Sequence, residues 1–152
     1  MTTKGVTLTF PAELKNLVAI RRFVQETAAS LQADAQELHD VILAVDESAA
    51  NIMVHGYRGG PGTVEVEVRP EGDALVVCLR DHAPPFDPTR VPAPDLTVPL
   101  DERPVGGLGV HLTRTLMDEV IHRLTPQGGN ELTLVKKAIL PNSEEQTHES
   151  HD

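Results

Sequence analysis

The sequence predicts an α+β fold, a two-layer α/β sandwich in which helices cover one face of a mixed, mainly antiparallel sheet. Residues 14–31 and 38–52 repeat apolar side chains at the three- and four-residue spacing of helices that pack on a core. Shorter segments either alternate apolar and polar residues or are apolar throughout, as strands do. The order is strand, two helices, two strands, long loop, helix and two strands, which is typical of a sheet layered on one side by helices.

Composition limits the size and class of the protein. The chain has 152 residues, of which 39% are apolar and 24% are charged, and this suits one globular domain with a single core. We expect that domain to span residues 1–140. Residues 141–152, PNSEEQTHESHD, are polar and aperiodic, and we expect them to form a disordered tail.

Charge and apolar runs restrict the partners and the compartment. With 23 acidic and 13 basic residues the formal charge is −10, which argues against binding to nucleic acid or to an anionic membrane. The sequence contains neither an apolar run of about 18 residues nor a signal peptide, so we expect a cytoplasmic protein. The single cysteine, Cys78, lies in an apolar run, which favours a buried and inert thiol.

The N-terminal segment predicts a strand followed by a helix. Apolar residues alternate with threonines over residues 6–10, and Pro11 suits the first position of a helix. This helix should end near Leu31. Asp34 then resembles the N-cap of a second helix, and Glu37 would complete a capping box.

The second helix should end at Gly56, and it carries three unusual polar residues. Glu47, Asn51 and His55 follow one another at four-residue intervals among small apolar residues. A carboxylate and an amide in such a setting need partners, so we expect all three polar residues to face an enclosed pocket. A helix with a mildly polar outer stripe is the alternative. The face expected to pack on the core consists of Leu38, Ile42, Val45, Ala49 and Ile52.

Four further strands are predicted. Thr63–Arg69 alternates strictly, so one of its faces should see solvent, whereas Ala74–Arg80 is apolar on both faces and belongs in the middle of the sheet. Residues 119–124 and 131–139 predict the last two strands. Asp81 follows the central strand, where ligands often bind in layered α/β proteins; that it simply caps a turn is the alternative.

A long loop and a glycine cluster separate the two pairs of strands. Residues 84–104 contain seven of the twelve prolines and no period, which indicates an extended and functional loop. Glycines at 106, 107 and 109 then precede a helix, a geometry that can present free amides to a phosphate. A hinge for the loop is the alternative. No P-loop lysine follows and no strand immediately precedes, so the P-loop and dinucleotide-fold interpretations both fail.

Three motifs, taken together, resemble those of a known superfamily. Ala44–Tyr57, AVDESAANIMVHGY, resembles the N box of the Bergerat-fold ATPases, and in particular that of bacterial anti-sigma factors which are also serine-protein kinases. Leu79–Asp87, LRDHAPPFD, is similar to their strand-end aspartate motif, and Gly106–Leu112, GGLGVHL, to their glycine motif. The resemblance covers roughly residues 10–139, and the motifs occur in the family's order.

The resemblance implies an ATP-binding, kinase-like domain with a site for ATP and Mg²⁺. Asn51 would ligate the Mg²⁺ that bridges the phosphates, and Asp81 would accept a hydrogen bond from the adenine amino group. Glu47 would be the catalytic residue that polarises the attacking hydroxyl. The other nucleotide-binding residues that the motifs imply are His55, Ala83, Phe86, Arg103, Gly106, Gly107, Leu108, Gly109 and Val110.

The chain departs from the family pattern at three places. Ala83–Pro85 replaces the glycines that usually follow the aspartate, so we expect a stiffer base pocket. Asn130 stands where a threonine is often found. The basic residue expected beside the glycine motif is displaced, which leaves Arg90 or Arg103 to reach the γ-phosphate.

The resemblance also implies protein partners. A serine on an anti-sigma antagonist of the STAS type would accept the phosphoryl group, a sigma factor would be the competing partner, and the chain would form a homodimer. The alternative is a nucleotide-switched binding module that sequesters a partner without phosphoryl transfer. A detached histidine-kinase ATPase domain is disfavoured, because the sequence shows no phosphorylatable histidine with its own helical bundle.

Overall fold

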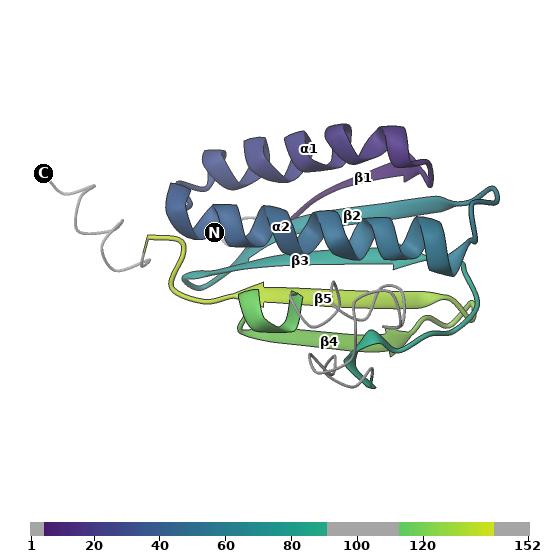
Figure 1. Cartoon of the computed structure of the whole chain (residues 1–152). Helices are drawn as coiled ribbons and strands as arrows, with labels where there is room; N and C mark the ends of the chain where they lie inside the picture. The colour runs from purple at the N-terminus through teal and green to yellow at the C-terminus, as the bar shows by residue number, and fades with distance from the viewer. Residues whose placement is uncertain (1–4, 91–112, 142–152) are drawn as a thin grey trace, which may run out of the picture.

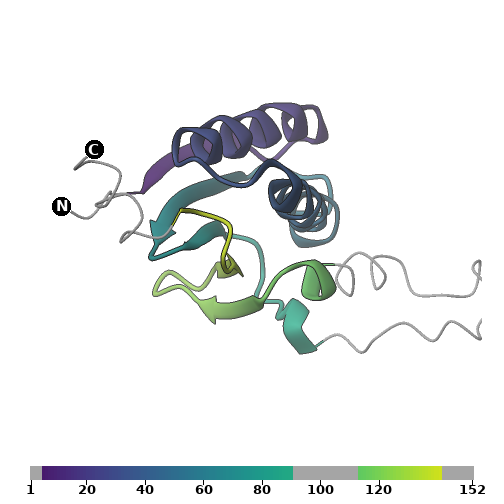
Figure 2. The same ribbon diagram turned by 90° about the vertical axis from the view of Figure 1, so that its left-hand side faces the viewer.

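The structure is a computed structural model, and it describes residues 5–90 and 113–141. Its main elements are β1 (Val6–Pro11), α1 (Leu17–Ser30), α2 (Ala35–Asn51), β2 (Thr63–Glu71), β3 (Ala74–Asp81), β4 (Glu119–Leu124) and β5 (Asn130–Lys136). The strands form one sheet in the order β1-β2-β3-β5-β4. Helices α1 and α2 run along the sheet in Figure 1, and the view in Figure 2 shows them as a separate layer on one side.

The predicted two-layer α+β sandwich is confirmed, but within the described residues the sheet is not mixed. All four pairings between the described strands are antiparallel. β3 lies between β2 and β5, and its burial on both faces confirms the predicted central strand. No helix of the described segments is long and apolar enough to cross a membrane.

The hydrophobic core lies between the helices and the sheet. Alternate residues of β2 supply one layer of it, because Val64, Val66 and Val68 are buried while Glu65 and Glu67 point to the other face. Each fully buried aliphatic side chain of this kind stabilises the fold by roughly 1.5–3 kcal/mol. Other fully buried members of the core are Ile20, Val24, Val41, Val45, Leu75, Leu79 and Leu134.

The chain enters α1 later than the sequence pattern predicted. Pro11 is the last residue of β1 rather than the first of the helix, and an edge strand tolerates its missing N–H. A short 3-10 turn, Leu14–Asn16, comes before Leu17. The predicted end of the helix near Leu31 is confirmed.

The N-cap of α2 is confirmed, whereas the second half of the capping box is not formed. Asp34 Oδ1 accepts from the N–H of Gln36 at 3.0 Å and of Glu37 at 2.9 Å. The N–H of Asp34, which a capping box would bond to Glu37, donates instead to the Ile139 carbonyl at 2.8 Å. Glu37 lies 3.5 Å from Lys136 Nζ, so long-range contacts replace the local one.

Helix α2 continues into a π-helical turn, Ile52–Gly56, so the helical segment ends at the predicted residue but in a wider form. Turns of this kind are frequent at functional sites. The N–H of Tyr57 closes it by donating to the Ile52 carbonyl at 2.9 Å.

The buried stripe of α2 agrees with the predicted one in part, because Leu38, Val45 and Ala49 are buried as predicted. Val41, Ala44 and Ser48 are buried as well, whereas Ile42 and Ile52 are only partly buried. The stripe is displaced because α2 packs on α1 as well as on the sheet.

The last two strands differ in how well their bounds were predicted. β4 has the predicted bounds, but β5 ends at Lys136, three residues earlier than residues 131–139 predicted. Ala138 has a φ of 57°, in the left-handed region, and turns the chain out of the sheet. The N–H groups of Ile139 and Leu140 then donate to the Asp73 carbonyl at 3.1 and 2.9 Å, which fastens this segment to the β2–β3 hairpin.

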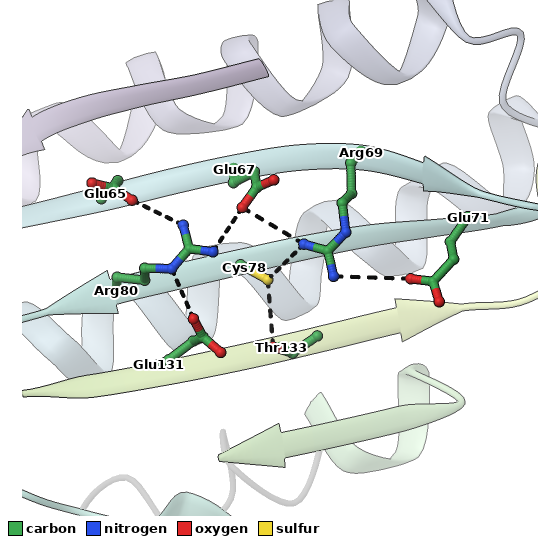
Figure 3. A network of polar contacts seen from close by, with 8 residues as sticks. All are labelled: Glu65, Glu67, Arg69, Glu71, Cys78, Arg80, Glu131 and Thr133. Carbon is green, nitrogen blue, oxygen red and sulfur yellow. Dashed lines mark hydrogen bonds and ion pairs between the residues drawn. The ribbon is translucent and has the colours of Figure 1, made fainter. Parts of the chain in front are cut away.

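The face of the sheet away from the helices carries an ion network (Figure 3). Arg80 on β3 donates to Glu131 at 2.9 Å, to Glu65 at 2.8 Å and to Glu67 at 2.7 Å. Burial by itself would lower the pKa of Arg80, but the hydrogen bonds to these three carboxylates raise it above its ordinary value. The guanidinium therefore stays charged and holds three strands together.

Cys78 is buried beside this network, as expected for an inert thiol. Its sulfur lies 3.3 Å from Arg69 Nη1 and 3.4 Å from Thr133 Oγ1 (Figure 3). The thiol therefore has polar partners, which the apolar sequence around it did not indicate.

Candidate functional site

A cavity open to solvent lies beside the C-terminal part of α2, at the end of β3 and the start of β5. Its free space is about 580 Å³ including the mouth. Helical residues line it on one side and sheet residues on the other, and most of the lining is apolar. The lining residues are Ser48, Asn51, Ile52, Gly56, Asp81, Ala83, Pro84, Phe86, Pro88, Thr113, Val120, His122, Asn130 and Leu132.

Asp81 is the buried carboxylate of this cavity. It is 4% exposed, and its Oδ1 accepts from Ala83 N–H at 2.9 Å and from Asn130 Nδ2 at 2.9 Å. The interpretation that Asp81 caps a turn is therefore correct for Oδ1. Within the described residues Oδ2 has no hydrogen-bond partner. Oδ2 is therefore the carboxylate oxygen that can accept from a ligand with an N–H or O–H group.

Asn130 connects Asp81 to the segment after β3. Its Nδ2 donates to Asp81 Oδ1 at 2.9 Å and lies 3.2 Å from both the Ala83 and Pro84 carbonyls. Its Oδ1 accepts from Phe86 N–H at 2.9 Å and faces His122 Nε2 at 2.8 Å. The sequence identified Asn130 only as a departure from the family's threonine. The register that pairs it with Asp81 is a tertiary feature.

His122 is a further polar residue of the cavity that the sequence did not single out. Its side chain is 7% exposed, and Nδ1 lies 3.8 Å from Asp87 Oδ1. The position of His122 on β4 could have identified it from the sequence. Its neighbours in the strand point to the open face, whereas His122 points to the helix-facing side together with Val120. A polar residue at a core-facing position of a strand indicates a specific partner, which here is Asn130.

Residues 82–86, which we name the strap, close the cavity at the sheet end. His82 N–H donates to Tyr57 Oη at 2.7 Å, and that hydroxyl donates to the Thr63 carbonyl at 2.8 Å. On the other side Asn130 holds the strap through Phe86 N–H. The stiffness of this segment stays a prediction, and the hydrogen bonds at both ends support it together with the prolines.

Two glycines allow the strap to approach its neighbours closely. A Cβ at Gly56 would lie 3.1 Å from Ala83 Cβ, and a Cβ at Gly129 would collide with the Asp81 carbonyl oxygen. Position 129 therefore needs glycine, whereas a Cβ at position 56 would require Ala83 to shift slightly.

The helix side of the cavity contains one of the three predicted polar residues. Asn51 lines it beside Ser48, whereas Glu47 and His55 are absent from the lining formed by the described residues. Glu47 is half-buried one helical turn from Asn51 and has no polar partner in the described parts of the chain. His55 is exposed, so the expectation that all three face an enclosed space is wrong for that residue.

The structure brings Asn51, Asp81, Ala83 and Phe86 together around one cavity. Thr113, which begins the described part of a short helix, contributes to the same lining. The remaining predicted residues lie outside the described residues, and they are Arg103, Gly106, Gly107, Leu108, Gly109 and Val110.

The oxygen chemistry on the helix side fits a hard cation. The amide oxygen of Asn51 would be one protein ligand, and Mg²⁺ usually takes only one or two ligands from protein and the rest from phosphates and water. Within the described residues there is no cluster of three His, Cys, Asp or Glu side chains that could hold a metal alone. Asn51 therefore fits a cation that arrives with a phosphate ligand.

Comparison with known proteins agrees with this geometry. The family model described as histidine kinase-like ATPase domain matches residues 10–136. Serine-protein kinase RsbW of Bacillus cereus (strain Q1) is 25% identical over 119 residues, which cover 76% of this chain and 74% of the relative. Serine-protein kinase RsbW of Bacillus mycoides (strain KBAB4) is 24% identical with the same coverage.

A solved structure supports the fold. The crystal structure of the RsbU and RsbW domains of Rv1364c from Mycobacterium tuberculosis matches with a TM-score of 0.63 and 19% identity. The match covers 92% of this chain but only 34% of the other chain, so this chain corresponds to about a third of that protein.

The family match extends from the end of β1 to the end of β5 and includes every described residue that lines the cavity. It therefore covers the N box and the strand-end aspartate that carried the resemblance to the Bergerat-fold ATPases, and that resemblance is confirmed. The chain belongs to the histidine kinase-like ATPase domain family.

Proposed function

We propose that the protein binds ATP with Mg²⁺ and acts as an anti-sigma regulatory factor with serine-protein kinase activity. The observation that carries the nucleotide part is Asp81, because its Oδ2 is an acceptor without a partner in the described residues, at the end of a mainly apolar cavity. Such an acceptor suits the amino group of adenine, and the apolar lining suits the face of the ring. The kinase part is supported by the relatives that are named serine-protein kinases.

Two residues of α2 have proposed roles at the phosphates. Asn51 holds the Mg²⁺ by its amide oxygen, and the bound ion would neutralise charge on the phosphate chain. Glu47, one turn earlier, orients the attacking serine hydroxyl and accepts its proton. Its half-buried carboxylate has no polar partner in the described residues, which leaves it available for this role.

The proposed partners are an anti-sigma antagonist of the STAS type, which supplies the serine, and a sigma factor that competes with it. The proposal includes a homodimer, and both partners rest on the resemblance to the RsbW proteins. A cytoplasmic location is part of the same proposal.

A second candidate function is a nucleotide-switched binding module that sequesters a partner without phosphoryl transfer. The position of Glu47 favours it, because this carboxylate is not among the described residues that line the cavity. The two candidates share the nucleotide site and differ only in the chemical step.

Glu47→Gln separates the two candidates. The variant keeps the shape of the side chain and removes its charge, so it should still bind MgATP and its partners. Loss of a general base lowers the rate of a chemical step by about 100-fold or more, and we expect that loss in phosphoserine formation on the antagonist. The measurement is incorporation of labelled phosphate from ATP into a panel of STAS-type antagonists.

The same assay shows which candidate fails. If wild type forms an ATP-sensitive complex with an antagonist but transfers no phosphate, the binding module replaces the kinase. If Glu47→Gln transfers at the wild-type rate, Glu47 is not the base. Binding that is equally tight with excess chelator would reject the role of Asn51.

A further inference from the structure

We propose that Asn130 is the positioning residue of the base pocket, and that His122 fixes the orientation of its amide. This inference rests on the proposed nucleotide site and adds to it the residue that determines which oxygen of the Asp81 carboxylate the base meets. Asn130 acts through Asp81 and through the strap, residues 82–86, rather than by touching the reacting atoms.

The contacts of Asn130 define its amide orientation without ambiguity. The three atoms around Nδ2 are the Asp81 carboxylate oxygen and the carbonyls of Ala83 and Pro84, and all three can only accept when Asp81 is ionised. The opposite orientation would turn an oxygen toward three acceptors. Nδ2 must therefore face Asp81, and Oδ1 must face Phe86 N–H and His122.

This orientation also determines the proton on His122. Asn130 Oδ1 can only accept, so His122 Nε2, 2.8 Å away, carries the hydrogen. The other ring nitrogen, Nδ1, lies 3.8 Å from Asp87 Oδ1. His122 is 7% exposed on β4 and cannot exchange this partner for bulk water without moving.

The network fixes the rotation of the Asp81 carboxylate. Ala83 N–H and Asn130 Nδ2 both donate to Oδ1. Oδ2 is then a pure acceptor at the cavity. A pure acceptor recognises the amino group of adenine and discriminates against hypoxanthine, which presents a carbonyl oxygen at the same position.

Replacing Asn130 by Asp tests this assignment, because the shape is kept while the donor is lost. The introduced carboxylate would turn an oxygen toward Asp81 Oδ1 and toward two carbonyls. Like charges at this distance do not both stay ionised, so the pair should share one proton and titrate together. Of the described residues, the titratable groups that face position 130 are Asp81 on β3, His122 on β4 and, through His122, Asp87 after the strap.

The sign of the pH effect follows from the shared proton. The pKa of the pair is raised above that of a free carboxyl. The repulsion between the two carboxylates is therefore present at high pH and is relieved as the pH falls through that pKa. We expect Asn130→Asp to weaken ADP binding by on the order of tenfold or more at pH 8 and by much less at pH 5.5. The shared proton lies between Asp81 Oδ1 and residue 130, so Oδ2 stays an acceptor and the preference for ADP over inosine diphosphate should be kept at pH 5.5.

The measurement is the ratio of the dissociation constants of variant and wild type at each pH, by calorimetry on the full chain with MgADP and with the magnesium salt of inosine diphosphate. Taking the ratio cancels ionisation of the nucleotide's own phosphates. Asn16→Asp is the matched control, because Asn16 donates to the Pro11 carbonyl at 2.9 Å on the exposed surface, and its ratio should stay near one. A ratio near one for Asn130→Asp, or a raised ratio that does not change with pH, would overturn the proposal.

A second pair of variants keeps the test decisive if Asn130→Asp does not fold. His122→Gln keeps an N–H near the position of Nε2, whereas His122→Met removes it. We expect the Gln variant to bind ADP several-fold more tightly than the Met variant and to keep more of the selectivity against inosine diphosphate. Equal affinity and equal selectivity of the two variants would reject the role of His122 in orienting Asn130.

Failure of the proposed function gives a different result. If wild type binds no adenine nucleotide, the kinase proposal fails, and thermal unfolding of the free Asn130→Asp variant still tests the shared proton. That variant should gain stability relative to wild type as the pH falls from 8 to 5.5. A pH-independent difference in melting temperature would reject the network in the free protein.

Discussion

Arg80 and Asp81 are neighbours on β3, but they face opposite sides of the sheet and differ in how their charges are satisfied. Arg80 lies on the open face and donates to three carboxylates of the same chain (Figure 3). Asp81 lies on the helix face, where Oδ1 has two donors and Oδ2 has none in the described residues. The register continues the contrast on β5, because Glu131 pairs with Arg80 and Asn130 with Asp81.

The difference separates a structural charge from a ligand-binding charge. A guanidinium with three carboxylates is complete without any other molecule and contributes only to the cohesion of β2, β3 and β5. A carboxylate with one unpaired oxygen at a cavity still has an acceptor to offer, and a ligand can supply the donor. Substitutions at the two positions should therefore affect different measurements.

The largest expected effect is the loss of nucleotide binding in Asp81→Asn. An amide that keeps its oxygen toward Asn130 and Ala83 would place an NH₂ group where Oδ2 was, so it would face the adenine amino group with a donor. MgADP at a hundredfold excess over the dissociation constant stabilises a protein by roughly 2.7 kcal/mol. We expect most of that stabilisation to disappear in thermal unfolding with and without MgADP.

The free Asp81→Asn protein should remain folded, and its preference for adenine over guanine nucleotides should be lost. A variant that keeps wild-type affinity and wild-type preference would show that Asp81 does not read the base.

Arg80→Met should give the opposite pattern. Removing the guanidinium leaves Glu65, Glu67 and Glu131 close together without a cation, and the Arg80 side chain is 28% exposed, so solvent screens only part of the repulsion. We expect the free energy of unfolding to fall by about 1–3 kcal/mol in urea titrations, between the values for surface and buried pairs.

Two further measurements sharpen the Arg80 test. The deficit should shrink as salt is added, since salt screens the three carboxylates from one another. The stabilisation by MgADP should match that of wild type. A variant that loses nucleotide binding in proportion to stability would mean that the two faces of β3 are not independent.

The smallest expected effect is that of Tyr57→Phe, which tests how far the cavity depends on the strap. The hydroxyl accepts from His82 N–H at 2.7 Å and donates to the Thr63 carbonyl at 2.8 Å, and both bonds are lost. We expect a loss of about 1 kcal/mol of stability, with nucleotide affinity reduced by about threefold or less, because Asn130 still holds the strap from β5. Calorimetry measures the MgADP affinity and urea unfolding measures the stability. If the loss of binding free energy exceeds the loss of unfolding free energy, Tyr57 is part of the site.

Much of the fold could be predicted from local patterns, because those patterns depend on periodicity along the chain. The alternation of β2, the apolar run of β3 and the N-cap at Asp34 are all present in the structure as the sequence indicated. The position of Asp81 at a strand end and of Asn51 on the cavity side of α2 could also be predicted, since the motifs place them there. The local patterns at Pro11 and Glu37 predicted the wrong role. Pro11 pairs in the edge strand β1 instead of starting a helix, and Glu37 contacts Lys136 instead of completing the capping box.

The sequence by itself therefore determined the order of the elements, the family motifs and the candidate residues Asn51 and Asp81. Only the tertiary structure decided which oxygen of Asp81 is available, because Asn130 lies 49 residues away along the chain and meets it through the β3–β5 register. His122 likewise joins the network only because β4 pairs with β5. Such contacts depend on the alignment of strands across the sheet, and local periodicity along one strand contains no information about the residue that will lie beside it.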